Sequence, residues 1–141
     1  MPQVKAVCVS PVQGPKNEVK EINLIEELGV EGDHHAKGGI RQVSLLANES
    51  IDKMKAKGLK LVNGSFGENI ITEGIDLLSL NIGERLAIGE TLLEISKIGK
   101  ECVKRCIIYY QVGDCVMPRE GIFGMVVKGG TIKAGDIIER M

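Results

Sequence analysis

The sequence has few aromatic residues: no tryptophan, two phenylalanines and two tyrosines, together 3% of the chain. Proteins that bind single-stranded nucleic acid stack bases on aromatic side chains, and this chain has too few to build such a surface. The net charge of -1 at pH 7 provides no broad basic surface for a phosphate backbone either. These features exclude a dedicated nucleic-acid-binding function.

The chain also lacks long apolar runs. No stretch approaches the roughly 20 apolar residues that a membrane-spanning helix needs, and residues 1–5 lack the apolar core of a signal peptide. We therefore expect a cytoplasmic protein without membrane contact. In the reducing cytoplasm, thiols or metal ligands are expected rather than disulfides at the four cysteines, Cys8, Cys102, Cys106 and Cys115.

Composition and length favour one globular domain over residues 1–141, because 43% of the residues are hydrophobic and 26% are charged. Glycine is abundant, with 18 residues, and it occurs beside many β-branched residues. This combination is typical of short strands joined by tight turns. We predict single strands at 4–10, 19–25 and 42–47, and hairpins at 86–95 and 125–133.

One helix is predicted over residues 49–57. Asn48 is a candidate N-cap, Ile51 and Met54 fall on one helical face, and Gly58 can end the helix. The rest of the chain shows little helical periodicity. The predicted fold class is therefore mainly β, a closed or partly closed β-barrel with one or two short helices.

A glycine-rich stretch at 29–40 contains both histidines of the chain, His34 and His35, and is followed by Arg41. Backbone N–H groups in such a loop can bind an anion, and Arg41 can add a bidentate contact to phosphate. The histidines can hydrogen-bond or bind a metal, but adjacent histidines point to different sides, which disfavours a zinc site that uses both. The alternative is a solvated surface loop in which Asp33 caps a turn.

A second polar stretch, 64–70, places Gly67, Glu68 and Asn69 where a strand is expected to begin. Polar side chains between glycines at the rim of a barrel can bind the ring nitrogens and carbonyl groups of a ligand. The alternative is an ordinary junction between a loop and a strand.

Two cysteines, Cys102 and Cys106, lie among basic residues, Lys97, Lys100, Lys104 and Arg105. Neighbouring cations favour the thiolate, which is both a nucleophile and a soft metal ligand. A zinc site is disfavoured, since the spacings of four and nine between Cys102, Cys106 and Cys115 match no common zinc motif. The alternative for any one cysteine is a buried apolar residue, which suits Cys8 in its valine-rich stretch.

These stretches form a pattern in their order and spacing: Gly32-Asp33-His34, Arg41-Gln42-Val43-Ser44-Leu45, Phe66-Gly67-Glu68-Asn69-Ile70, Arg105-Cys106-Ile107 and the closing segment 130–136. The pattern resembles the MOSC family, which is named for the C-terminal domain of molybdenum-cofactor sulfurases. The resemblance covers nearly the whole chain. It implies a β-barrel with a functional cysteine.

The resemblance also implies a site. In relatives that include the mitochondrial amidoxime-reducing component, the molybdenum ligand is a cysteine in an Arg-Cys pair followed by apolar residues. Arg105-Cys106-Ile107-Ile108 matches this pattern, so Cys106 is the predicted metal ligand and reactive thiolate, with Cys102 as the alternative. The residues implied to bind the molybdenum cofactor, molybdopterin, are Asp33, His34, Arg41, Gln42, Gly67, Glu68, Asn69 and Arg105.

Three functions follow from the resemblance. The first is a cofactor-binding or sulfur-carrying protein, in which Cys106 holds a persulfide or passes the cofactor to a sulfur donor or acceptor protein. The second is a molybdenum-dependent reductase of N-hydroxylated small molecules. The third is a regulatory or scaffold domain without catalysis.

Overall fold

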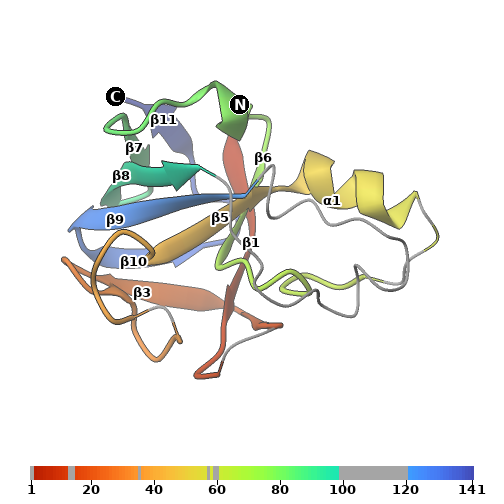
Figure 1. The fold of residues 1–141 in the computed structure, drawn as a ribbon, viewed down its shortest axis with the longest axis horizontal. Helices are drawn as coiled ribbons and strands as arrows, with labels where there is room; N and C mark the ends of the chain where they lie inside the picture. Colours follow the sequence, from red (N-terminus) through yellow and green to blue (C-terminus); the bar gives the residue numbers. More distant parts are fainter. Residues whose placement is uncertain (1, 13–14, 35, 57, 59–60, 99–120) are drawn as a thin grey trace.

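The computed structural model of the protein describes residues 2–12, 15–34, 36–56, 58, 61–98 and 121–141. These residues form a mainly β fold with short helices (Figure 1). In chain order the elements are β1 (Gln3–Val9), β2 (Asn17–Val19), β3 (Glu21–Ile25), β4 (Gly29–Val30), β5 (Val43–Ala47), α1 (Asn48–Lys55), β6 (Ile70–Glu73), η1 (Leu77–Ser79), β7 (Arg85–Ile88), β8 (Thr91–Ile98), β9 (Ile122–Lys128), β10 (Gly130–Lys133) and β11 (Ile138–Arg140).

The strands form two sheets. Eight strands follow the order β11-β7-β8-β9-β5-β6-β1-β2, and three follow the order β10-β3-β4. Alternate residues of β3 are buried, and its Ile22 and Leu24 belong to the same apolar cluster as Leu86 and Leu93 of the large sheet. Burial of each such side chain stabilises the fold by about 1.5–3 kcal/mol. This shared core holds the two sheets together.

The sequence pattern predicted a closed or partly closed β-barrel. A closed barrel is not found among the described strands, where the large sheet ends at β11 on one side and at β2 on the other. Between β1 and the segment leading into β11, the described residues form one bridge, Gln3 with Ile137. Nearby, the Val4 amide donates to the Asp136 carbonyl over 2.8 Å. β11 spans only three residues, and these already pair with β7. No strand-to-strand ladder therefore forms between β1 and β11 among the described residues. The mainly β class is confirmed, and the closed barrel is corrected to an open strand order.

The predicted hairpins have different outcomes. The hairpin at 86–95 is confirmed, because β7 and β8 pair antiparallel across a tight turn. The hairpin at 125–133 is wrong: β9 pairs with β8 and β5, whereas β10 pairs with β3 in the small sheet. The chain crosses between the sheets at Gly129, where a Cβ would lie 2.5 Å from the Leu24 carbonyl oxygen. A glycine is required for this close crossing.

The single strands are largely as predicted. The stretches at 4–10 and 42–47 correspond to β1 and β5 within one residue at their ends. The stretch at 19–25 is divided, because the chain bends at Lys20 between β2 and β3.

The predicted helix is present as α1, and its Ile51 and Met54 are buried in a second apolar cluster that also contains Cys8 and Phe66. As predicted, Gly58 follows the helix end: it has a φ of +90°, and its amide donates to the Lys55 carbonyl over 3.0 Å. A second, short helix is η1.

The predicted cap at Asn48 is wrong. The helix begins one residue earlier than expected, with Ala47 in the N-cap position and no side-chain hydrogen bond there. The Asn48 side-chain Nδ2 instead donates to the Asp52 carboxylate over 3.3 Å, one turn into the helix.

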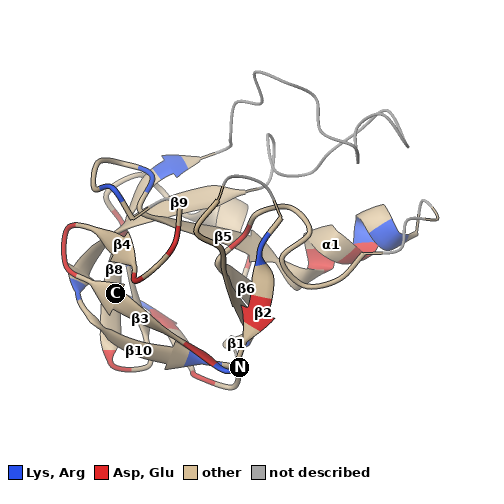
Figure 2. Cartoon of the chain, turned by 90° about the horizontal axis from the view of Figure 1, so that it is seen from below, with Lys and Arg blue, Asp and Glu red and all other residues tan. Residues whose placement is uncertain are grey.

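Charged residues are spread over the strands, the loops and α1, with Lys and Arg interspersed with Asp and Glu (Figure 2). In the described part of the chain, no helix has the length and apolar character needed to cross a membrane.

Candidate functional site

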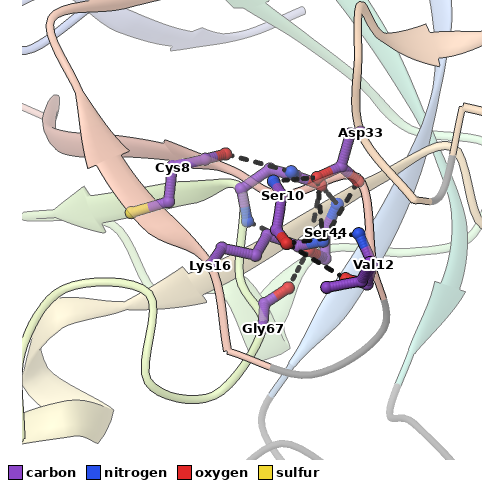
Figure 3. A network of polar contacts seen from close by, with 8 residues as sticks. Cys8, Ser10, Val12, Lys16, Asp33, Ser44 and Gly67 are labelled. Atoms are coloured by element: carbon purple, nitrogen blue, oxygen red, sulfur yellow. Dashed lines mark hydrogen bonds and ion pairs between the residues drawn. The ribbon is translucent and has the colours of Figure 1, made fainter.

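Four segments that are distant in the sequence meet near the end of β1. They are the connection from β1 to β2, the loop after β4, the start of β5 and the loop before β6. Together they form a group of buried polar side chains, the polar cluster, which consists of Ser10, Lys16, Asp33, Ser44, Glu68 and Asn69. Figure 3 shows the contacts that join most of these residues.

The polar cluster contains a buried ion pair between Lys16 and Asp33. The ammonium group lies 2.9 Å from Asp33 Oδ1 and 3.1 Å from Oδ2, and the two side chains are 1% and 0% exposed (Figure 3). Asp33 Oδ1 also accepts from the Ser10 amide over 3.0 Å, and the His34 amide donates to the Ser10 carbonyl over 2.7 Å. The pair therefore fixes the loop after β4 to the end of β1.

The Asn69 side chain joins three strands. Its Oδ1 accepts from the Ser44 amide over 3.0 Å, and its Nδ2 donates to the Cys8 carbonyl over 3.1 Å. The Ser44 hydroxyl lies 3.0 Å from the Gly67 carbonyl oxygen and 3.1 Å from Asn69 Oδ1. Asn69 is fully buried, so these contacts replace the water that its amide would otherwise bind.

Glu68 is a fully buried carboxyl group with unequal oxygens. Oε1 accepts from the Phe66 amide over 3.0 Å, whereas Oε2 has no hydrogen-bond partner among the described residues. Burial raises the pKa of Glu68 to about 7, although backbone N–H groups of the loop and the nearby Lys16 charge act in the opposite direction. Near neutral pH this group therefore exists in both protonation states.

The Cys8 thiol lies beside the polar cluster and is buried. Burial, followed by the charges of Glu68 and Glu18, raises its pKa to about 12, with Lys16 acting in the opposite direction. Cys8 is therefore a neutral thiol in the folded protein. The prediction that it is a buried apolar residue is confirmed.

Arg41 and Gln42 lie just before β5. The Gln42 side chain is buried: its Nε2 donates to the Gly39 carbonyl over 2.9 Å, and its Oε1 accepts from the Val126 amide over 2.9 Å. Arg41 is half-buried, and its guanidinium carbon lies 5.9 Å from the centre of the Phe123 ring. Gln42 thus fixes the backbone next to the charged Arg41.

The structure brings together most of the described residues that the sequence singled out. Asp33 and His34 contact Ser10, and Asn69 contacts the Cys8 carbonyl two residues earlier on the same segment. Cys102, Arg105, Cys106 and the other basic residues of that stretch beyond Lys97 lie outside the described residues, as does His35. A described pocket of about 320 Å³ lies elsewhere, between α1 and residues 74–78, and none of the predicted site residues lines it.

A comparison with protein families identifies the chain. The family profile described as "MOSC domain" matches residues 32–139, which is most of its length. The chain belongs to the MOSC domain family. No curated protein matches it in the sequence comparison.

Solved structures share the fold of this MOSC domain. The YuaD protein from Bacillus subtilis is 17% identical with a TM-score of 0.79, covering 98% of this chain and 94% of that chain. YiiM from Geobacillus stearothermophilus is 19% identical with a TM-score of 0.76, covering 100% of this chain and 75% of that chain. YiiM from Escherichia coli is 22% identical with a TM-score of 0.69, covering 99% of this chain and 69% of that chain. At these identities the likeness establishes the fold alone.

Sequence reasoning missed Lys16. Lysine is rarely buried, and nothing in the stretch around Lys16 marks it as the partner of Asp33, which is 17 residues away. Ser10 was missed for a related reason, because its amide and carbonyl bind the loop after β4 through backbone groups that carry no residue signature. In this MOSC domain the polar cluster is thus built partly by residues outside the recognisable motifs.

Proposed function

We propose that this MOSC domain binds the molybdenum cofactor, or carries sulfur for it, through the thiol of Cys106, with Cys102 as the alternative. The observation that supports the proposal most is the family match over residues 32–139, since MOSC domains are associated with this cofactor. The matched region contains the Arg105-Cys106 pair. It also contains Asp33, Arg41 and Asn69, which come from three separate stretches.

The chemistry of the available donors fits such a group. A thiolate is a soft ligand suited to molybdenum, and guanidinium groups such as those of Arg41 and Arg105 suit the phosphate of a pterin cofactor. Arg41 is half-buried, and its guanidinium carbon lies 5.9 Å from the centre of the Phe123 ring. When bound, the cofactor supplies a redox-active molybdenum centre.

The contacts of Gln42 and Asn69 support a structural role for these two residues rather than direct ligand binding. The Gln42 side chain bonds to the backbone of Gly39 and Val126. The Asn69 side chain bonds to the backbone of Ser44 and Cys8. We propose that Gln42, Asn69 and the Lys16–Asp33 pair hold the loops in place, while Arg41, Arg105 and Cys106 contact the cofactor. Glu68 is proposed to act on the conformation of the loop before β6 rather than as a ligand.

In the sulfur-carrier form of the proposal, the Cys106 thiolate attacks the outer sulfur of a donor persulfide. A new S–S bond forms on Cys106, the donor S–S bond breaks, and the donor leaves as a thiolate. The acceptor then takes the outer sulfur by the same exchange. This form needs a protein partner on each side of the transfer, and no external oxidant.

Binding of isolated molybdopterin to the purified protein tests the cofactor form. Pterin fluorescence should co-elute with the wild-type chain in gel filtration, and should be lost with Cys106→Ser and weakened by Arg41→Ala. Cys115→Ser is the matched control and should bind as wild type does. Loss with Cys102→Ser but not with Cys106→Ser would move the assignment to Cys102, and equal binding by all variants would contradict a thiol-dependent site.

A further inference from the structure

Glu68 stands in a loop, residues 61–68, that is called here the latch loop. The loop lies against the connection between β1 and β2, where the Lys16 amide donates to the Gly64 carbonyl over 2.8 Å. It also lies against Cys8, because a Cβ on Gly64 would be 3.4 Å from the Cys8 sulfur. Glu68 Oε1 accepts from the Phe66 amide, so the carboxyl group also braces the backbone of its own loop.

The surroundings of Glu68 contain an unbalanced set of charges. Lys16 faces it from the β1–β2 connection, Cys8 is on β1, and Glu18 of β2 acts on Cys8. The Lys16 ammonium group contacts both carboxylate oxygens of Asp33. One ammonium group thus stands with two buried carboxyl groups, and the set is neutral only when Glu68 carries a proton.

The burial of the Glu68 carboxyl group gives a second, geometric observation. Glu68 is 0% exposed, and its Oε2 is buried without a hydrogen-bond partner among the described residues. A charged oxygen in that position lacks both water and a donor, which is strongly unfavourable. A protonated carboxyl group avoids this penalty, and so does a carboxylate that reaches water when the loop moves.

We propose that Glu68 is a proton-dependent latch: its neutral carboxyl group keeps the latch loop closed against Cys8 and Lys16, and loss of its proton to solvent loosens the loop. The loosening reaches the polar cluster, because the neighbouring Gly67 carbonyl accepts from the Ser44 hydroxyl. The proposed latch uses only residues of the chain, so it does not require a bound cofactor.

The direction of the pH dependence follows from the protonation of Glu68. Its pKa is about 7 in the closed loop, against an ordinary value of 4.5 when the group is exposed. The contribution of Glu68 to closure is therefore fully present below pH 4.5 and is lost as the pH rises through 7. Between these values the equilibrium constant for opening rises by up to tenfold per pH unit.

Hydrogen exchange read by mass spectrometry tests the latch. The wild-type chain and Glu68→Gln, which keeps the shape of the neutral side chain and cannot ionise, are compared at pH 5 and pH 8. In peptides from the latch loop, the ratio of wild-type to variant exchange rate should rise more than tenfold from pH 5 to pH 8. The exposed Glu139→Gln is the matched control, and its ratio should stay constant.

An equal wild-type to Glu68→Gln ratio at the two pH values would overturn the latch. A rise of the same size in peptides from β7 and β8 would also overturn it, because the effect would then be global unfolding. If Glu68→Gln does not fold, the latch is tested on the wild-type chain alone. Its latch-loop exchange, divided by the intrinsic rate at each pH, must rise more than tenfold relative to that of β7 and β8.

Discussion

Lys16 is a lysine whose side chain is 1% exposed and contacts both oxygens of Asp33. The substitution Lys16→Met removes this cation from a buried carboxylate, so we expect a loss of about 3–5 kcal/mol in the free energy of unfolding. Urea denaturation at pH 7 measures it. The double variant Lys16→Met, Asp33→Asn should recover most of the loss, because the charges of the pair are then both removed.

Lys5→Met is the matched control for this ion-pair prediction. Lys5 lies 3.7 Å from the Glu73 carboxylate, and the two side chains are 42% and 41% exposed. Exposed pairs of this kind contribute about 0–1 kcal/mol. Equal losses for Lys16→Met and Lys5→Met would show that the buried pair does not hold the loop after β4.

Thiol reactivity separates the cysteines of the chain. Cys8, whose pKa is raised to about 12 by burial and nearby carboxylates, should be the last to react with iodoacetamide at pH 7. Cys106, which adjoins Arg105, is expected first, before Cys102 and then Cys115, which follows Asp114. Mass-spectrometric mapping gives the order. Fast modification of Cys8 would contradict its burial, and Cys102 reacting first would move the functional assignment to that residue.

For single residues, the sequence predicts which polar positions belong to the site better than it predicts which residues they contact. Asp33 and Asn69 are recognisable because they stand in glycine-rich stretches with a family pattern. Their partners, Lys16 and Ser44, lie 17 and 25 residues away along the chain. Such pairs are determined by how the loops approach in three dimensions, which neither periodicity nor motif spacing contains.

Gly64 gives a prediction at the scale of the loop. Gly64 and Gly83 have φ values of +94° and +92°, but a Cβ on Gly64 would lie 2.1 Å from the Lys16 carbonyl oxygen, whereas nothing lies within 4 Å at Gly83. Gly83→Ala therefore reports backbone strain alone, about 1–2 kcal/mol. Gly64→Ala must also push the latch loop away from the β1–β2 connection, so we expect a loss of about 3 kcal/mol or more in urea denaturation. Equal losses in the two variants would contradict the close approach.

Elements were predicted well where local chemistry decides them. The turn between β7 and β8 joins strands that pair with each other, so the glycine turn and the strand pattern gave the correct hairpin. The Gly129-Gly130 dipeptide looks the same in the sequence, but there it allows a close crossing from one sheet to the other. The choice of pairing partner depends on burial against Leu24 and the rest of the core, which a two-residue turn does not encode.

For the whole molecule, the sequence predicted the mainly β fold class but not whether the large sheet closes into a barrel. Short strands, glycine turns and a single amphipathic segment were sufficient for a mainly β fold with α1. Whether the large sheet closes depends on residues at opposite ends of the chain, and among the described residues Gln3 and Ile137 provide the bridge. The family was also predictable from the sequence, because the order and spacing of the motifs are specific although each motif alone is a weak signal.

We propose that this MOSC domain binds the molybdenum cofactor or carries its sulfur through Cys106. The most direct test is to purify the wild-type chain and Cys106→Ser from a host that makes the cofactor. Each preparation is analysed for molybdenum, for pterin by fluorescence after oxidation, and for sulfane sulfur released by cyanide as thiocyanate. We predict stoichiometric molybdenum with pterin, or stoichiometric sulfane sulfur, in the wild type and neither in Cys106→Ser. A wild-type protein free of all three, or a Cys106→Ser variant that retains them, would overturn the proposed role of Cys106.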